Sequence, residues 1–152
     1  MGEADYKRSR KNERGASLVE FSIAATVFLL AMFAVLEFGR ALWVHNALTD
    51  AARKGARYAV LHQASDIDNV KRVVVYGDPA GGTNPVVDNL DIPNVVVSYS
   101  QAPDPPFGLD TGTVSVSITN YQFQFALPIG VTSIQMPSYT TTLTGECAGL
   151  LP

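Results

Sequence analysis

The feature that most constrains this chain is an uninterrupted apolar run near its N-terminus. Between Phe21 and Leu36 the sequence contains no charged residue, and Glu37 marks the return to polar sequence. A helix from Ala16 to Leu36 would be about 31 Å long at about 1.5 Å per residue, which matches the hydrocarbon thickness of a bilayer. The sequence therefore predicts a helix that crosses a membrane once, over about residues 16–36.

One residue conflicts with a plain membrane anchor. Glu20 lies one turn into the predicted span. A carboxylate within a membrane helix costs on the order of 2.5–3.5 kcal/mol on insertion scales, so such a residue is a candidate functional residue. A cleaved secretory signal is not expected, because no small-x-small site follows Leu36. A lipoprotein is not expected either, because the only cysteine, Cys147, lies near the far end of the sequence. A single cysteine cannot form an internal disulfide, so the redox compartment stays open.

The charges of the chain are unevenly distributed. Residues 1–15 hold five of the eleven basic residues, namely Lys7, Arg8, Arg10, Lys11 and Arg14. A basic flank stays on the cytoplasmic side, so the N-terminus is expected inside and the C-terminal part outside. A nucleic-acid or lipid patch is the alternative interpretation of this leader. After Arg72 there is no Lys or Arg, which argues against nucleic-acid binding by the distal part.

The helical pattern continues beyond the membrane, to about His62. Small and aliphatic residues recur at three- and four-residue steps: Ala41, Val44, Leu48, Ala51, Ala52, Gly55 and Ala59. A polar stripe opposes them and consists of Asn46, Asp50, Arg53 and Arg57, with Asp50 four residues before Lys54. Small residues permit close approach, so we expect this stripe to pack in a core, with subunit packing as the alternative.

Residues 65–76 are ambiguous, because Ser65 resembles a helix start whereas Val73, Val74 and Val75 favour a strand; we expect a short helix. Residues 77–85 are expected to be a turn-rich loop. The last third alternates as strands at 95–100 and 114–119, with a final piece near Tyr139.

The strand pattern changes its phase near Asn120. Before this residue the large side chains occupy even positions, whereas Tyr121, Phe123 and Phe125 occupy odd ones. One extra residue would produce this change, so we expect a bulge or bend that turns the strand, with the aromatic residues in the core. The Pro-rich stretch 101–112 is interpreted as a long loop, either a recognition surface or a connector.

The start of the apolar run has a specific resemblance. Gly15 precedes the run, Glu20 follows five residues later, and Phe21 is next. This arrangement resembles the processing site of type IV pilin-like precursors, which implies that a membrane peptidase cuts between Gly15 and Ala16. The new amino group of Ala16 would be cationic near neutral pH, and Glu20 would pair with the amine of a neighbouring subunit.

Two further motifs sharpen the resemblance. Glu37-Phe38-Gly39-Arg40 closes the run, and Ala51-Ala52-Arg53-Lys54-Gly55-Ala56-Arg57-Tyr58-Ala59 follows it. Together with the processing site they are similar to the TadE-like pseudopilin family, over roughly residues 14–60. The resemblance implies a minor pseudopilin of a tight-adherence (Flp-type) pilus or related secretion system in the bacterial inner membrane. Its implied partners are a prepilin peptidase, other pilins or pseudopilins and the assembly machinery.

These observations predict an α+β, pilin-like fold, in which a long N-terminal helix packs its second half on a small antiparallel sheet. Residues 1–15 would form the cytoplasmic leader. Residues 16–62 would form the helix, with the span over 16–36 and an amphipathic extension over 37–62. Residues 63–152 would form the extracytoplasmic globular part.

Enzymatic chemistry has little support in the sequence. His45 and His62 have no carboxylate or cysteine at ligand spacing, and the acidic residues after Arg72 fall in turns, where a cation site is only a minor alternative. The Asp-x-Ser-x-Ser motif carried by larger relatives is absent. We therefore expect no catalytic residue and no cofactor. Two alternatives remain: a bitopic protein with a binding or sensing domain that is never cleaved, and the main subunit of a filament.

Overall fold

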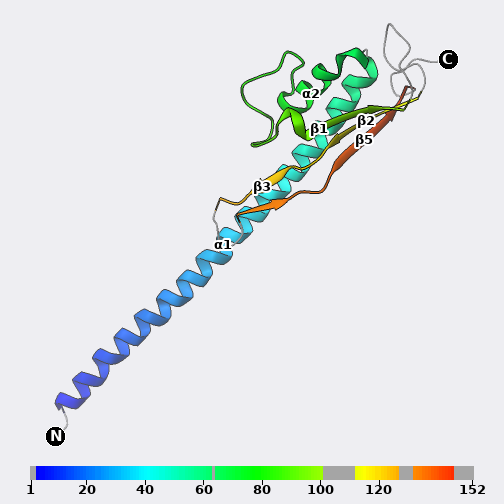
Figure 1. Ribbon diagram of the computed structural model, residues 1–152. Coiled ribbons are helices and arrows are strands. Elements are labelled where there is room, and N and C mark those ends of the chain that lie inside the picture. The colour runs from blue at the N-terminus through cyan, green and yellow to red at the C-terminus, as the bar shows by residue number, and fades with distance from the viewer. Residues whose placement is uncertain (1–2, 63, 101–111, 127–131, 146–152) are drawn as a thin grey trace. The chain divides into compact units, whose positions relative to one another are not determined.

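The computed structural model describes residues 3–62, 64–100, 112–126 and 132–145, with side chains from Gly15 onward. It consists of two compact units, Met1–Arg40 and Ala41–Pro152, which we call unit 1 and unit 2 and describe separately. The helix α1, Glu3–Leu61, provides the whole described part of unit 1 and the first part of unit 2 (Figure 1). It ends one residue before the expected end near His62.

Unit 1 is a helix with almost no tertiary contacts of its own. Between Gly15 and Arg40 all side chains are exposed except Ala25 and Glu37, which are half-buried. The segment Gly15–Leu61 of α1 is long and apolar enough to cross a membrane. A surface of this composition is unfavourable in water, so unit 1 has the properties of a single membrane span.

Unit 2 contains five short strands in two antiparallel sheets. The larger sheet has the order β1-β2-β5, formed by Val95–Tyr99, Thr113–Ile118 and Tyr139–Thr144. The smaller sheet pairs β3, Gln122–Gln124, with β4, Ser133–Gln135. The α+β architecture of a long helix and a small antiparallel sheet is thereby confirmed. The strand β4 was not predicted, because its three residues are too few to show an alternating pattern.

The phase change near Asn120 marks the point where the chain leaves one sheet for the other. Asn120 adopts a left-handed conformation with φ of 58°, and it lies between the end of β2 and the start of β3. The expected bend is therefore confirmed. It keeps Tyr121 and Phe123 buried in the core, and Phe125 half-buried at its margin, as predicted.

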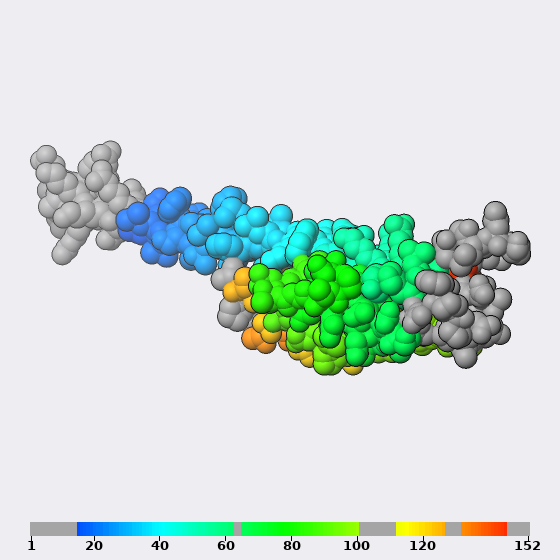
Figure 2. Space-filling model, turned by 90° about the horizontal axis from the view of Figure 1, so that it is seen from above, coloured from blue at the N-terminus to red at the C-terminus, as the bar shows by residue number. Residues whose placement is uncertain are grey.

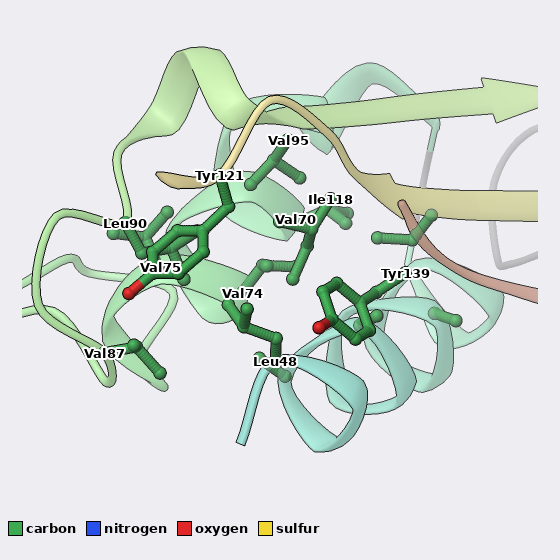
Figure 3. Packing of buried hydrophobic residues seen from close by; sticks show 14 of the residues in the cluster. Leu48, Val70, Val74, Val75, Val87, Leu90, Val95, Ile118, Tyr121 and Tyr139 are labelled. Atoms are coloured by element: carbon green, nitrogen blue, oxygen red, sulfur yellow. The ribbon is translucent and has the colours of Figure 1, made fainter. Parts of the chain in front are cut away.

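One face of the α1 segment in unit 2 lines the hydrophobic core. Val44, Leu48, Ala51, Ala52, Ala56, Ala59 and Val60 are buried there, together with residues of α2 and of the larger sheet (Figure 3). The small residues allow close packing. A Cβ atom added to Gly55 would collide with Cγ2 of Val74 and would lie 3.4 Å from Cγ1 of Val116. The interpretation of this stripe as core packing is confirmed.

The ambiguous segment 65–76 is helical. A short 3-10 turn, Ala64–Asp66, leads into α2, Ile67–Tyr76, so the helix begins two residues after the expected Ser65. Gly77 ends α2 in the left-handed conformation, and its N–H donates to the carbonyl of Val73 at 2.9 Å. The helix prevails over the β propensity of its valines because Val70, Val74 and Val75 are all buried in the core.

The residues after α2 form a turn-rich connection, as predicted, which a second 3-10 turn, Ile92–Asn94, joins to β1. The N–H of Val86 donates to the carbonyl of Val75 at 2.7 Å and holds this connection against α2. Of the predicted loop 101–112, only Gly112 is among the described residues. Cys147 also lies outside them.

Two tyrosine hydroxyls in unit 2 differ in their partners. The hydroxyl of Tyr121 donates to the carbonyl of Asp88 at 2.8 Å. The hydroxyl of Tyr99 is buried and has no hydrogen-bond partner among the described residues. Burial raises the pKa of the Tyr99 phenol, and the negative charge of Asp66 raises it further. A buried hydroxyl without a partner destabilises the folded state.

This difference predicts opposite effects of removing the two hydroxyls. Tyr121→Phe should lower the free energy of unfolding by about 0.5–1.5 kcal/mol, because it breaks a hydrogen bond and leaves a carbonyl without its donor. Tyr99→Phe should leave stability unchanged or raise it, because the hydroxyl that it removes has no partner among the described residues. Chemical denaturation of both variants of the full chain in detergent micelles measures the difference. Equal losses in the two variants would contradict the assignment of an unpaired Tyr99 hydroxyl.

Candidate processing and assembly site

The predicted cleavage position lies in an accessible part of α1. Gly15 and Ala16 are both exposed, and a Cβ atom added to Gly15 would have no heavy atom within 4 Å. The peptide bond between them is part of a helix, so a peptidase would have to unwind this turn before attacking the carbonyl. Glycine helps, because it is about 1 kcal/mol less favourable than alanine inside a helix.

Glu20 lies one helical turn after Ala16, on the same face of α1. Its side chain is exposed, and its neighbours Val19 and Phe21 are exposed apolar residues. Glu20 forms no ion pair with any side chain that the structure describes. A carboxylate in apolar surroundings is stabilised by a cation brought close to it, so the geometry leaves Glu20 suited to receive one.

The other polar side chains next to Glu20 are satisfied within the helix. Ser22 donates to the carbonyl of Leu18 at 2.7 Å, and Thr26 donates to the carbonyl of Ser22 at 2.8 Å. Such bonds let hydroxyl groups enter a lipid environment without unpaired donors. The same two residues line a shallow depression of about 350 Å³ with Val19, Ile23 and Val27. Glu20 therefore differs from these neighbours, because its charge is not satisfied by the helix.

The motif Glu37-Phe38-Gly39-Arg40 ends the apolar segment with an internal ion pair. The guanidinium group of Arg40 contacts the Glu37 carboxylate, one turn away on the same helix. Pairing reduces the cost of placing two charges beside an apolar phase. Phe38 is exposed, and a Cβ atom added to Gly39 would touch nothing within 4 Å.

The second motif is divided between the core and the surface of unit 2. Its small residues Ala51, Ala52, Gly55 and Ala56 are buried. Its cations Arg53 and Arg57 are exposed on the opposite side of the helix. Between them, Lys54 forms the expected ion pair with Asp50 at 2.9 Å. The small residues thus serve the packing of α1 on the sheet, whereas the arginines are available to other molecules.

The two histidines have structural partners. Nδ1 of His45 lies 2.9 Å from the Tyr139 hydroxyl, and the two rings meet edge to face with centroids 5.1 Å apart. Nδ1 of His62 lies 2.9 Å from the backbone carbonyl of Tyr58. The His62 ring also stacks on the Tyr58 ring. Asp78 accepts a hydrogen bond from the N–H of Ala80 at 2.8 Å, as expected for a turn. Among the described residues, no three potential metal ligands gather.

The predicted residues therefore do not form one pocket. Gly15, Ala16 and Glu20 share a helix face in unit 1, whereas the second motif belongs to unit 2. Sequence reasoning missed two exposed apolar residues at the start of unit 2, Leu42 and Trp43. Their signal in the sequence was the single tryptophan three residues after Arg40.

The fold and this helix are compatible with a single-pass membrane protein that carries a small α+β unit. Residues 15–57, less than a third of the chain, match the family described as TadE-like protein. The match begins at Gly15 and ends at Arg57, so it includes the first motif and the second as far as Arg57, and it confirms the resemblance over these residues. Neither the comparison with curated proteins nor that with solved structures gave a significant match.

Proposed function

We propose that this protein is a minor pseudopilin of a tight-adherence (Flp-type) pilus or a related secretion system. A prepilin peptidase would remove residues 1–15 and leave the span in the inner membrane for pilus assembly or initiation. The proposal rests on two features that coincide at the start of the apolar helix. The family match begins at Gly15, and the same apolar helix presents Glu20, whose carboxylate has no ion-pair partner among the described side chains.

Cleavage would create the cation that Glu20 lacks. Hydrolysis of the bond after Gly15 gives Ala16 an α-amino group with an ordinary pKa near 8, so it is protonated at neutral pH. In a bundle of spans, this amine of one subunit would pair with Glu20 of its neighbour. The pair offsets part of the desolvation that a carboxylate suffers in lipid. Before cleavage this cation does not exist, so assembly would depend on processing.

The remaining parts have supporting roles in this proposal. The basic leader keeps the N-terminus in the cytoplasm, where the peptidase acts, and unit 2 lies outside. The protein is a substrate of an enzyme and has no catalytic role of its own. Exposed Arg53 and Arg57 provide positive charge for contacts with other pilins or the assembly machinery.

The test is the intact mass and N-terminal sequence of the membrane-extracted protein from its native host. We expect a mature chain that starts at Ala16. In a Gly15→Leu variant we expect the full-length chain, because the larger side chain blocks the peptidase subsite. Gly39→Leu is a matched control, since Gly39 is also an exposed helical glycine with open space around it. It should be processed normally.

A native chain that keeps residues 1–15 in a host producing the pilus would contradict the proposal. That result would favour a bitopic binding or sensing protein. Processing with high abundance in the filament would instead identify a main subunit, because minor subunits are scarce.

A further inference from the structure

The end of unit 2 that begins with Ala41 differs from the rest of the unit in its surface. Leu42 is 48% exposed and Trp43 is 59% exposed, in the first turn of this helix segment. The β3–β4 hairpin lies toward the same end. Figure 1 shows β3 beyond the end of the larger sheet at which β1 begins. In this hairpin Ile134 is 51% exposed.

Hydrogen bonds place the hairpin at this end of unit 2. Tyr139, the first residue of β5, contacts His45 in the second turn of the helix segment. The hairpin continues the strands beyond that point, because Met136 bonds to Tyr121 and Phe125 bonds to Thr132, at 2.9 and 3.0 Å. Ile134 therefore lies farther from the C-terminal ends of α1 and β5 than Tyr139 does.

This end of unit 2 is also uncharged. No Asp, Glu, Lys or Arg occurs at 41–49 or at 113–145, so neither the first turns of the helix segment nor the hairpin carries a formal charge. The nearest acidic loop contacts the start of the hairpin, where the hydroxyl of Tyr121 donates to the carbonyl of Asp88. The other charged residues follow from Asp50 onward. Figure 2 shows the segment that carries most of them, coloured green, packed along the helix.

We propose that this end of unit 2, presented by Leu42, Trp43 and Ile134, rests on the lipid surface on the outer side of the membrane. The inference depends on the membrane anchoring in the proposed function. Ala41 lies five residues after Leu36 along the helix, which advances the chain by about 8 Å. The headgroup layer of a bilayer is about 5–8 Å thick on each side. The first turn of unit 2 is thus at the depth where tryptophan is enriched in membrane proteins.

Lipid is the partner that fits the chemistry of this surface. Burying charges at a lipid boundary is costly, and this end has none to bury. Its exposed apolar side chains are an amphipathic indole and two aliphatic groups, and beside them the strands expose the uncharged polar residues Gln122, Gln124 and Gln135. Transfer of the apolar groups into the headgroup region is favourable, and uncharged amides can bond to headgroups and water there. Docking would restrict the angles that unit 2 can adopt above the membrane. The exposed arginines on the helix would then be held at a fixed height for partner subunits.

Fluorescence in nanodiscs that hold one full-length chain each tests the inference. Trp43 is the only tryptophan, so its emission reports this position alone. In a Cys147→Ser background, an environment-sensitive fluorophore is attached to Ile134→Cys or to the matched control Val96→Cys. Val96 is 50% exposed on β1, so the two sites are equally accessible in the free unit. Brominated lipids should quench Trp43 and the probe at position 134 strongly, and the probe at position 96 hardly at all.

Three results would overturn the inference. Quenching of Trp43 without quenching at position 134 would show an inserted span with a freely tumbling unit 2. Equal quenching at positions 134 and 96 would show contact without a preferred end. Loss of quenching at position 134 in discs with several copies would show that this surface prefers another copy. Resistance to alkaline extraction and the N-terminal sequence are measured separately and report membrane anchoring and processing. Failure of the proposed function can therefore be distinguished from failure of this inference. Thermal melting of both labelled variants verifies their folding.

Discussion

Glu20→Gln should abolish association of the mature chain with its pilus partners while leaving processing at Gly15 intact. The substitution keeps the size of the side chain and removes its charge. Breaking a buried ion pair by neutralising one member costs about 3–5 kcal/mol, because the other charge is left unpaired in low dielectric. Such a loss corresponds to a decrease in association of at least about two orders of magnitude. Quantitative co-purification from membranes of the native host measures it.

Glu20→Asp is the conservative control, because it retains the carboxylate on a shorter side chain. We expect it to restore most of the association. A Glu20→Gln chain that associates normally would show that the charge pairing is wrong.

A pair within one chain is the other arrangement to test. Ala16 and Glu20 are one turn apart on the same helix. Mixing tagged Glu20→Gln chains with wild-type chains separates the two arrangements. Pairing between subunits predicts partial rescue, since each variant chain still donates its amine to a wild-type neighbour. Pairing within a chain predicts no rescue.

Gly55→Leu should strongly destabilise unit 2. The position is buried, and even a single added carbon would collide with Val74. Inserting methylenes into a packed core costs about 1–3 kcal/mol and sometimes more, and leucine adds four carbons where the helix backbone meets the side chain of Val74. Small domains are stable by only about 5–15 kcal/mol, so such a loss would remove a substantial part of this margin. Circular dichroism melting of the full chain in detergent micelles, together with resistance to proteolysis, measures the loss.

Gly39→Leu is the matched control for this effect as well. It is helical, and a Cβ atom there would have open space, so the variant should melt like the native chain. A second test uses Gly55→Ala, which should destabilise through the same collision. Adding Val74→Ala to Gly55→Ala removes the colliding methyl groups and should recover part of the lost stability. A stable Gly55→Leu chain, or a double variant worse than the sum of its parts, would contradict the close contact.

Most of the local structure of this chain followed from its sequence. The apolar run between Phe21 and Leu36 predicts a helix, because backbone N–H and C=O groups in lipid must form hydrogen bonds within their own segment. The stripe from Val44 to Ala59 predicts the buried face of the same helix, since its period is that of an α-helix. Alternation predicts the strands of the larger sheet, and the phase change at Asn120 predicts the bend between the two sheets. These signals are strong because they depend only on residues close together in the chain.

The candidate site was predicted less completely. Gly15, Ala16 and Glu20 were found because a carboxylate in an apolar span is conspicuous in any sequence. The division of the second motif was not visible: small residues such as Gly55 belong to the core, whereas Arg53 and Arg57 remain exposed. That division depends on which face of the helix meets the sheet.

The sequence by itself determined the helix that is apolar enough to cross a membrane, the strands of the larger sheet and the residues that carry the family signature. Only the tertiary structure decided that Val74 lies against Gly55, that the Tyr121 hydroxyl has a partner while that of Tyr99 has none among the described residues, and that Trp43 is exposed. The physical reason is that these properties arise from contacts between segments far apart in the chain. Such contacts depend on shape and on the neighbours that packing supplies, and no local pattern of residues records them.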